Sequence, residues 1–190
     1  MRKAVVALLL AIAVSALALP PVPRKAPELT IVEPSGKQTP LSSTKGKVVV
    51  IEFLYTTCPH CQAASQVITK LQKELGPRGF QAFGVAFNDN AQMLVPQFVQ
   101  QFNVGYPVGF ATEDTIRTYL GLSVMDRYSV PQEVVIDRKG MIRAQSGVDG
   151  DPKLQEESSL RALVESLLKE SAAPGTDTKK TTATTTKKPS

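Results

Sequence analysis

Apolar and polar positions come in blocks along the chain, and several blocks predict β-strands. Residues 47–55 form a continuous apolar run rich in β-branched side chains, which is typical of a strand buried on both faces. Residues 80–87 predict a second apolar strand. Residues 133–137 and 141–145, joined by the turn at 137–140, predict a hairpin.

Between and after these strands, apolar residues recur at spacings of three and four, the period of an amphipathic helix. The first helix follows Cys58 and is stopped by Gly76-Pro77. Its apolar positions are Ala64, Val67, Ile68, Leu71 and Leu75. A second helical stretch follows residues 88–90, which offer N-caps, and Pro96 must lie in its first turn or kink it.

Two further helices complete the pattern. Residues 112–120 predict a short helix. The last helix carries an uninterrupted apolar stripe, made of Leu160, Leu163, Val164, Leu167 and Leu168. Strands that alternate with helices and end in a hairpin plus a helix indicate an α/β sandwich with a mixed central β-sheet. One domain, residues 28–171, accounts for the whole pattern, and we find no internal repeat and no glycine-rich phosphate loop.

The two ends of the chain differ from this body. Residues 1–25 have a short basic start, an uncharged apolar run over 4–19 and a small-x-small pattern at 16–18, followed by a proline-rich linker. This is the form of a secretory signal peptide, with a retained N-terminal membrane anchor as the alternative and a core helix as a third. A signal peptide or an anchor places the domain outside the cytoplasm, periplasmic or secreted. Residues 172–190 hold no large apolar side chain and predict a disordered Thr/Lys-rich tail.

Charge and cysteine content exclude several classes of protein. The formal net charge is +5, but residues 26–172 hold 14 basic and 16 acidic residues, so the body has no basic surplus for nucleic acid. Two Cys and one His cannot form a disulfide-rich scaffold or a four-ligand zinc site. Because Gln62 follows Cys61, the pattern for covalent haem attachment is absent as well.

The candidate chemistry lies in Cys58-Pro59-His60-Cys61, where a buried strand leads into a helix. This spacing places both sulfurs on one face of the first helical turn, close enough to form a disulfide and to open it. The helix N-terminus and a protonated His60 both favour the thiolate of Cys58, the attacking species in disulfide exchange. Pro59 suits the first turn because it has no N–H. A structural disulfide or a metal-binding pair remains the alternative.

Glu52 is the second candidate, because a carboxylate inside an apolar strand is costly to bury without a function. Its position, six residues before Cys58, places it beneath the helix and near Cys61. Burial would raise the pKa of Glu52 and suit it to accept the thiol proton of Cys61 when that sulfur attacks a mixed disulfide. The alternative is that Glu52 points to solvent at a sheet edge.

These residues together resemble the thioredoxin superfamily, and residues 28–171 resemble its TlpA-type, ResA-like redoxins. The similarity lies in Ser35-Gly36-Lys37, the strand before the motif, residues 102–107 and the segment Val130-Pro131 through Gly140. The resemblance implies a thioredoxin-like three-layer sandwich and an extracytoplasmic thiol–disulfide oxidoreductase. It also implies a cis Pro131 facing the disulfide and a Val130 backbone that binds substrate. From the residues alone, both isomers of the Val130–Pro131 bond stay open.

The string from Glu52 to Cys61 departs from TlpA-type members and resembles DsbA-type oxidases, although the helical insertion of those proteins has no room here. Stabilising the Cys58 thiolate makes the disulfide a better oxidant, so we expect an oxidant acting on protein thiols. The alternatives are a disulfide reductase for cytochrome c maturation or copper-site proteins, and a Cu(I) carrier using the two cysteines. We expect no cofactor besides the Cys58–Cys61 pair, no resident metal, and a redox partner that resets the pair.

Overall fold

Eight strands form one mixed sheet in the computed structural model, which describes residues 19–170. The strands are β1 (Arg24–Lys25), β2 (Thr30–Val32), β3 (Gln38–Pro40), β4 (Val48–Leu54), β5 (Phe80–Ala86), β6 (Val108–Phe110), β7 (Gln132–Ile136) and β8 (Met141–Gln145). Their order across the sheet is β1-β8-β7-β4-β5-β6-β2-β3. The pairs β4–β5 and β5–β6 are parallel and the other neighbours are antiparallel.

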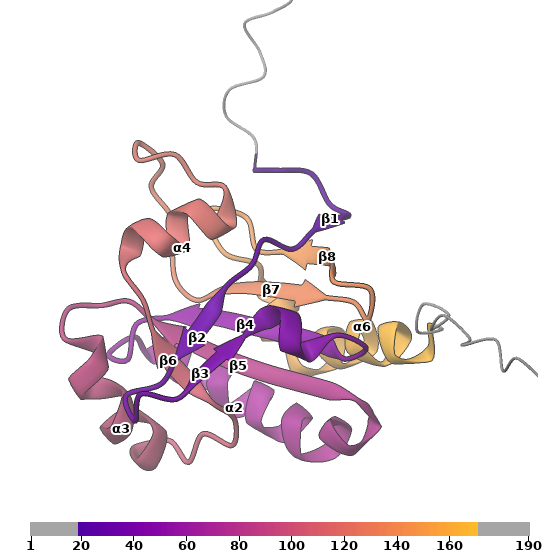
Figure 1. Ribbon diagram of the computed structural model, residues 1–190, viewed down its shortest axis with the longest axis horizontal. Coiled ribbons are helices and arrows are strands. Elements are labelled where there is room, and N and C mark those ends of the chain that lie inside the picture. Colours follow the sequence, from indigo (N-terminus) through magenta and orange to yellow (C-terminus); the bar gives the residue numbers. More distant parts are fainter. Residues whose placement is uncertain (1–18, 171–190) are drawn as a thin grey trace, which may run out of the picture.

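Helices cover both faces of this sheet (Figure 1). They are α2 (Pro59–Leu75), α3 (Ala91–Gln101), α4 (Glu113–Leu120), α5 (Pro152–Gln155) and α6 (Glu157–Lys169), with 3-10 turns η1 (Leu41–Thr44) and η2 (Gly76–Arg78). The helices α2, α3 and α6 pack on one face and α4 on the other. The predicted three-layer α/β sandwich with a mixed central sheet is therefore confirmed.

Strand β4 shows how the sequence builds two separate cores, because side chains of a strand alternate between its faces. Its even positions, such as Val50 and Leu54, pack in one apolar cluster with the buried side of α2. Its odd positions, such as Ile51 and Phe53, pack in a second cluster with the buried side of α4. Glu52 is an even position, so it lies on the α2 face.

The predicted strands and helices of the body are confirmed to within a residue or two, but the start of α3 differs from expectation. Asn90 adopts a left-handed conformation with φ of 57° and makes no side-chain cap, and the Asn88 side chain instead accepts from the Thr56 N–H. Pro96 lies inside the helix beyond its first turn, on the exposed side.

The N-terminal strands were not predicted. Arg24 and Lys25, which the sequence assigned to the linker before the domain, form β1 and pair with Ile142 and Met141 of β8. The ordered body thus begins before residue 28. Strands of two or three residues, such as β1 to β3, are too short for an alternating pattern to show in the sequence.

The predictions for the termini fall on residues 1–18 and 171–190, which lie outside the described residues. Within residues 19–170, no helix is long and apolar enough to cross a bilayer.

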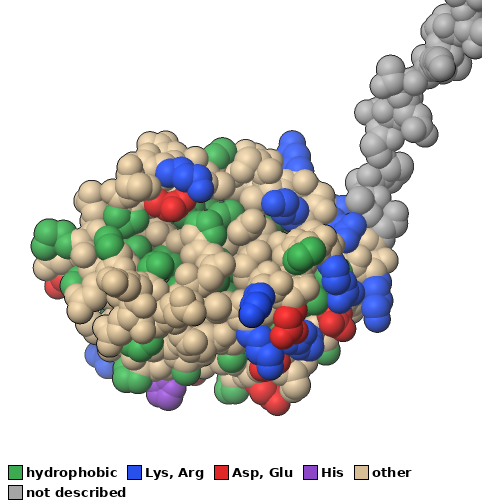
Figure 2. Space-filling model, turned by 90° about the horizontal axis from the view of Figure 1, so that it is seen from below, with side chains coloured by type: hydrophobic (Ala, Val, Ile, Leu, Met, Phe, Trp, Pro, Cys, Tyr) green, Lys and Arg blue, Asp and Glu red, His purple; other side chains and the backbone are tan. Residues whose placement is uncertain are grey.

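On the side covered by α2, α3 and α6, positively and negatively charged side chains are paired with one another and do not form a large area of one charge. Figure 2 shows this face, with positive and negative side chains intermixed over one part of it. Ion pairs join α2 to α6, at 2.8 Å between Lys70 and Glu157 and 2.7 Å between Arg161 and Glu74. Such exposed pairs contribute about 1 kcal/mol or less each.

Candidate active site

The loop after β4 delivers Cys58 to the N-terminus of α2. Cys58 is the N-cap residue, and its Sγ accepts from the Cys61 N–H at 3.4 Å. Pro59 is the first helical residue, where a missing N–H leaves no gap in the hydrogen bonds of the helix. Cys58 is partly exposed, whereas Cys61 is buried with none of its surface exposed. One sulfur therefore meets solvent and the other lies behind it.

Two side chains fix the backbone of this loop. The Thr56 N–H donates to Asn88 Oδ1 at 2.9 Å, and Gln62 Nε2 donates to the Thr56 carbonyl at 3.1 Å. The Cys58 N–H also donates to the Tyr55 carbonyl at 3.1 Å. These bonds set where Cys58 lies before any substrate arrives.

The segment Val130-Pro131 lies beside Cys58, although 72 residues separate Val130 from it along the chain. The Val130 carbonyl oxygen is 3.8 Å from Cys58 Sγ. The Val130–Pro131 bond is cis, as the resemblance implied, and Pro131 is buried. His60, the second residue of α2, is exposed at the surface.

Glu52 lies beneath this site and is completely buried, which excludes the alternative that it points to solvent. Its Oε2 accepts from Ser65 Oγ at 2.7 Å and from the Tyr106 hydroxyl at 2.8 Å. Burial raises the pKa of Glu52 to about 7, against the opposing effect of these two hydrogen bonds. Burial also raises the pKa of Cys61, and the charge of Glu52 adds to that shift.

A second buried carboxyl, Glu133 in β7, was not singled out from the sequence. It is the direct register partner of Glu52 and is also completely buried. Ser146 Oγ donates to Glu133 Oε2 at 2.6 Å. Burial raises the pKa of Glu133 to about 8, and the nearby charge of Glu52 contributes. The signal that identified Glu52, a carboxylate in an apolar strand, was present for Glu133 too.

Three aromatic rings pack together in the apolar cluster that Val130 contacts. Tyr55 contacts Phe87 edge-on with ring centroids 4.6 Å apart, and Phe87 stacks with Tyr128 at 6.2 Å. The Arg117 guanidinium lies 4.8 Å from the centre of the Tyr128 ring. Packing of this kind holds the segment before Pro131 against the end of β4.

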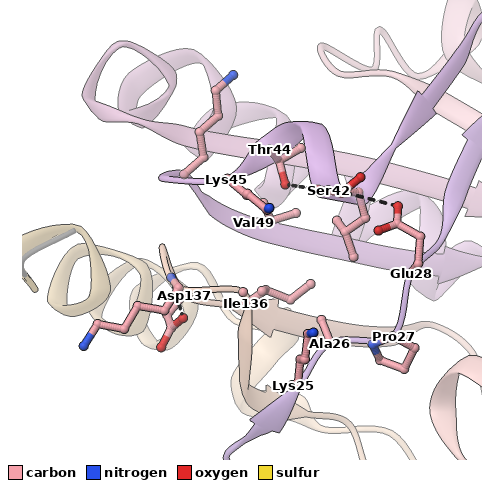
Figure 3. A pocket seen from close by; sticks show the side chains of 14 residues that line it. Lys25, Ala26, Pro27, Glu28, Ser42, Thr44, Lys45, Val49, Ile136 and Asp137 are labelled. Carbon is pink, nitrogen blue, oxygen red and sulfur yellow. Dashed lines mark hydrogen bonds between the residues drawn. The ribbon is translucent and has the colours of Figure 1, made fainter. Parts of the chain in front are cut away.

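Two hollows lie at opposite ends of β4. One of about 290 Å³ adjoins the start of α2, and its lining includes Thr57 and Gln62 from the cysteine side and Phe98 and Phe102 from α3 and its end. The other, of about 220 Å³, is shown in Figure 3 and lies near Val49 at the start of the strand, with Lys25 and Lys45 among its lining residues. Only the first hollow adjoins the cysteines.

The described residues do not provide a cluster of side chains that could bind a metal ion. Within residues 19–170, no three side chains of His, Cys, Asp or Glu come together in a way that could hold a metal ion. Cys58 and Cys61 remain the two sulfur ligands from which a Cu(I) site could start.

Comparisons with known proteins agree with these observations. A sequence model of the family described as Redoxin matches residues 21–164. The thiol:disulfide interchange protein DsbE of Escherichia coli K12 is 28% identical over 68% of this chain and 64% of its own length. The thiol-disulfide oxidoreductase ResA of Bacillus cereus is 25% identical over 63% of this chain and 65% of its own length. The match thus spans just under two thirds of each of these relatives.

Solved structures agree on the architecture. A thiol:disulfide interchange protein of the thioredoxin family from Chlorobium tepidum TLS superposes with a TM-score of 0.65 at 27% identity. That match covers 78% of this chain and 99% of the other. The thioredoxin-like fold implied by the resemblance is therefore confirmed.

Proposed function

The chain belongs to the redoxin family, and from that premise we propose that it is a thiol–disulfide oxidoreductase that exchanges disulfides with protein substrates through Cys58 and Cys61. The observation that carries this proposal is the unequal placement of the two sulfurs. Cys58 Sγ is partly exposed at a helix N-terminus and 3.8 Å from the Val130 carbonyl, while Cys61 is buried behind it. An exposed sulfur meets the substrate, and a protected one completes the exchange.

In the oxidising direction, a substrate thiolate attacks Cys58 Sγ of the Cys58–Cys61 disulfide. The S–S bond breaks, Cys61 leaves with the electron pair, and a mixed disulfide joins Cys58 to the substrate. A second substrate thiolate then attacks the substrate sulfur of that bond, so that the substrate gains a disulfide and Cys58 leaves as a thiolate. The cysteine pair carries the two electrons, and the proposal needs no other cofactor.

Glu52 supplies the proton chemistry of the buried sulfur. When Cys61 leaves as a thiolate it takes a proton from the protonated Glu52 carboxyl, and in the reverse step its thiol returns the proton to Glu52. The pKa of Glu52, raised to about 7 by burial, lets both forms exist near neutral pH. The Val130 backbone next to Pro131 is placed to pair with an extended substrate segment beside Cys58.

The direction that we propose is oxidation of substrate thiols. Cys58 lies at the N-terminus of α2, where the helix dipole stabilises negative charge on a released sulfur and so favours the reduced form of the protein. The likeness of the Glu52–Cys61 string to DsbA-type oxidases supports the same direction. Equilibration with glutathione tests it: a reduction potential near that of thioredoxin, about −270 mV, would reject oxidation and favour the disulfide reductase.

Trapping of the mixed disulfide tests the exchange itself. A Cys61→Ala variant has no sulfur to release a bound substrate, so it should accumulate a covalent adduct with a peptide disulfide, visible by mass spectrometry. Cys58→Ala is the matched control and should form no such adduct, because Cys61 is buried. Adducts on Cys61 in the control would refute the assignment. Cu(I) bound stoichiometrically in reducing buffer, without exchange activity, would favour the copper carrier.

We also propose that the domain works outside the cytoplasm, because catalytic disulfides that oxidise other proteins belong to oxidising compartments. The N-terminal segment of the sequence supports this location. The expected partners are protein thiols or disulfides and a redox partner that resets the pair. Fractionation of cells that make the full chain tests the proposal, and recovery only with cytoplasmic proteins would contradict it.

A further inference from the structure

Two buried glutamate side chains project side by side from neighbouring strands at the centre of the sheet, and the proposed function uses only one of them. Glu52 in β4 and Glu133 in β7 are direct partners across an antiparallel pair. The Glu133 backbone bonds to the other side, because its N–H donates to Ser146 Oγ and its carbonyl accepts from the Ser146 N–H, both at 2.9 Å. Glu52 and Glu133 therefore form the type of pair in which side chains approach most closely, with Cα atoms about 4.5 Å apart.

The two carboxyls use their oxygens in the same way. Oε2 of Glu52 accepts from Ser65 and Tyr106, and Oε2 of Glu133 accepts from Ser146. Within the described residues, Oε1 of each carboxyl is buried and has no hydrogen-bond partner. A buried oxygen left without a partner is unfavourable by about 1–3 kcal/mol, and by more when it is charged. A proton held between the two carboxyls gives both free oxygens a partner.

The groups around Glu52 and Glu133 include no positive charge that could pair with the carboxyls among the described residues, so a proton is the means of neutralising them. Glu52 faces Cys61 of α2 and Tyr106 before β6, and Glu133 faces Asp151 at the N-cap of α5. All of these are acids. In residues 19–170, no ion pair with Lys, Arg or His involves either carboxyl. Like charges this close cannot both form without a large penalty, which makes their ionisations interdependent.

We propose that Glu52 and Glu133 work as one acid pair, in which Glu133 keeps its proton and donates it as a hydrogen bond to Glu52 while Glu52 exchanges a proton with Cys61. Glu133 is thus a positioning residue that acts through Glu52. Burial raises the pKa of both carboxyls, and the charge of Glu52 raises the pKa of Glu133 further, which favours this order of ionisation. The proposal rests on the proposed function for its link to Cys61, but the pairing itself does not depend on that function.

The proton balance follows directly for the resolving step, in which Cys61 attacks the mixed disulfide and which is the reverse of the oxidising step described above. The pair starts with one proton, on Glu133, and a charge of −1. Cys61 gives its thiol proton to Glu52 and attacks Cys58 Sγ of the mixed disulfide, forming the Cys58–Cys61 bond as the substrate sulfur leaves with the electron pair. The pair then holds two protons and no charge, and it later releases one proton to water.

Carbon-13 NMR titration of the glutamate carboxyls in the reduced protein tests the pairing without any substrate. In the wild type, the Glu52 signal should follow two steps, because Glu133 ionises after it. Glu133→Gln keeps a hydrogen-bond donor, so Glu52 should titrate once, at the midpoint of the first wild-type step. Glu133→Met removes the donor and should raise that midpoint by about one pH unit, a tenfold change in the ionisation constant.

Matched controls separate the pair from a merely structural Glu133. Glu74→Gln alters an exposed carboxyl on α2 and should leave the Glu52 curve unchanged. Ser146→Ala keeps both carboxyls and should move the second step to higher pH, because the Ser146 hydrogen bond lowers the pKa of Glu133. A Glu52 curve identical in the wild type and both Glu133 variants would overturn the pairing, and so would a Glu133 signal that titrates near pH 4.

The pH dependence of the exchange rate tests the link to Cys61. When the reduced protein reduces a peptide disulfide, Glu52 must be ionised to accept the Cys61 proton, so the acid limb of that profile should move with the NMR midpoint of Glu52. The limb should lie at higher pH in Glu133→Met and at the wild-type position in Glu133→Gln. A limb that stays fixed while the NMR midpoint moves would overturn the role of Glu133 in the reaction. If the wild type shows no exchange at all, the proposed function fails, and the NMR titration still decides whether the two carboxyls form a pair.

Discussion

Both faces of β4 carry buried apolar side chains, but only the α2 face also buries a carboxyl. On the α2 face, Glu52 lies among buried polar groups that include Glu133 and Cys61. On the α4 face, Ile51 and Phe53 lie in an apolar cluster, where Phe53 contacts the Tyr119 ring at 5.4 Å. Burial of the carboxyls on the α2 face is energetically unfavourable, whereas burial of apolar side chains on the α4 face stabilises the fold without that cost. The difference predicts that changes to the polar groups of the first face alter chemistry, whereas changes on the second face alter stability alone.

The largest effect is expected at the exposed sulfur. Cys58→Ser should lower the rate of disulfide exchange by about 10³-fold or more, because a serine oxygen cannot form the mixed disulfide. The free energy of unfolding should change by about 1 kcal/mol or less, since serine is a good N-cap residue. Reduction or oxidation of a model peptide, together with urea denaturation, measures both. Retention of full exchange activity would refute the role of Cys58.

On the opposite face, Phe53→Ala should lower the free energy of unfolding by about 3–5 kcal/mol, because it removes a completely buried ring. Urea denaturation measures the loss. The reduction potential of the folded protein should stay as in the wild type. A changed potential with unchanged stability would mean that the two faces do not have separate roles.

Stability should also depend on pH through the two carboxyls. Burial raises their pKa values from 4.5 to about 7 in Glu52 and about 8 in Glu133, so the folded state binds more protons than the unfolded state in this range. The contribution of these carboxyls to stability is therefore fully present below about pH 4.5 and is lost as the pH rises through 7 and 8. At about 1.4 kcal/mol for each pH unit between the unfolded and folded pKa, the loss should be on the order of 3–5 kcal/mol per carboxyl.

A Glu52→Gln/Glu133→Gln double variant tests this dependence, because neither amide ionises. Between pH 5 and pH 9 the free energy of unfolding should fall in the wild type by about the amount given above, and it should not show this fall in the double variant. Urea denaturation across that range makes the comparison. Parallel pH profiles of the wild type and the double variant would show that folding does not raise the pKa values of the two carboxyls.

A smaller effect is expected at the helix over the apolar face. The Thr112 side chain caps α4 by accepting from the Thr115 N–H at 3.3 Å. Thr112→Ala should cost about 1 kcal/mol of stability and leave the exchange rate unchanged. Thermal or urea denaturation detects the first, and the peptide assay the second. Thr112→Ser is the matched control, because it keeps the capping oxygen and should stay close to the wild type.

The smallest effect sets the baseline. Met125 lies in the loop after α4 with 85% of its surface exposed. Met125→Ser should change the free energy of unfolding by about 0.5 kcal/mol or less in urea denaturation, because it removes almost no buried area. A larger loss would show that the loop contributes to the apolar face.

Long blocks of the sequence predicted the body of the fold because each block carries its own period. The run at 47–55 is apolar on both faces and the stripe ending at Leu168 is apolar on one, so each predicts its own element, and β4 and α6 formed where expected. The short strands β1 to β3 have no such period and depend on the edges that they join. The cap of α3 failed for a related reason, since Asn88 bonds to Thr56 in a distant loop.

The amino-acid order was sufficient to identify the cysteine pair, its place at a helix N-terminus and the buried strand that carries Glu52, because these are local patterns. It also assigned Glu52 a face, since alternation along a strand is local. The partners of that side chain came from folding: Tyr106, Ser65 and Glu133 meet it through helix packing and strand register. Contacts between residues far apart in the chain depend on how whole elements dock, and no period within one element specifies them.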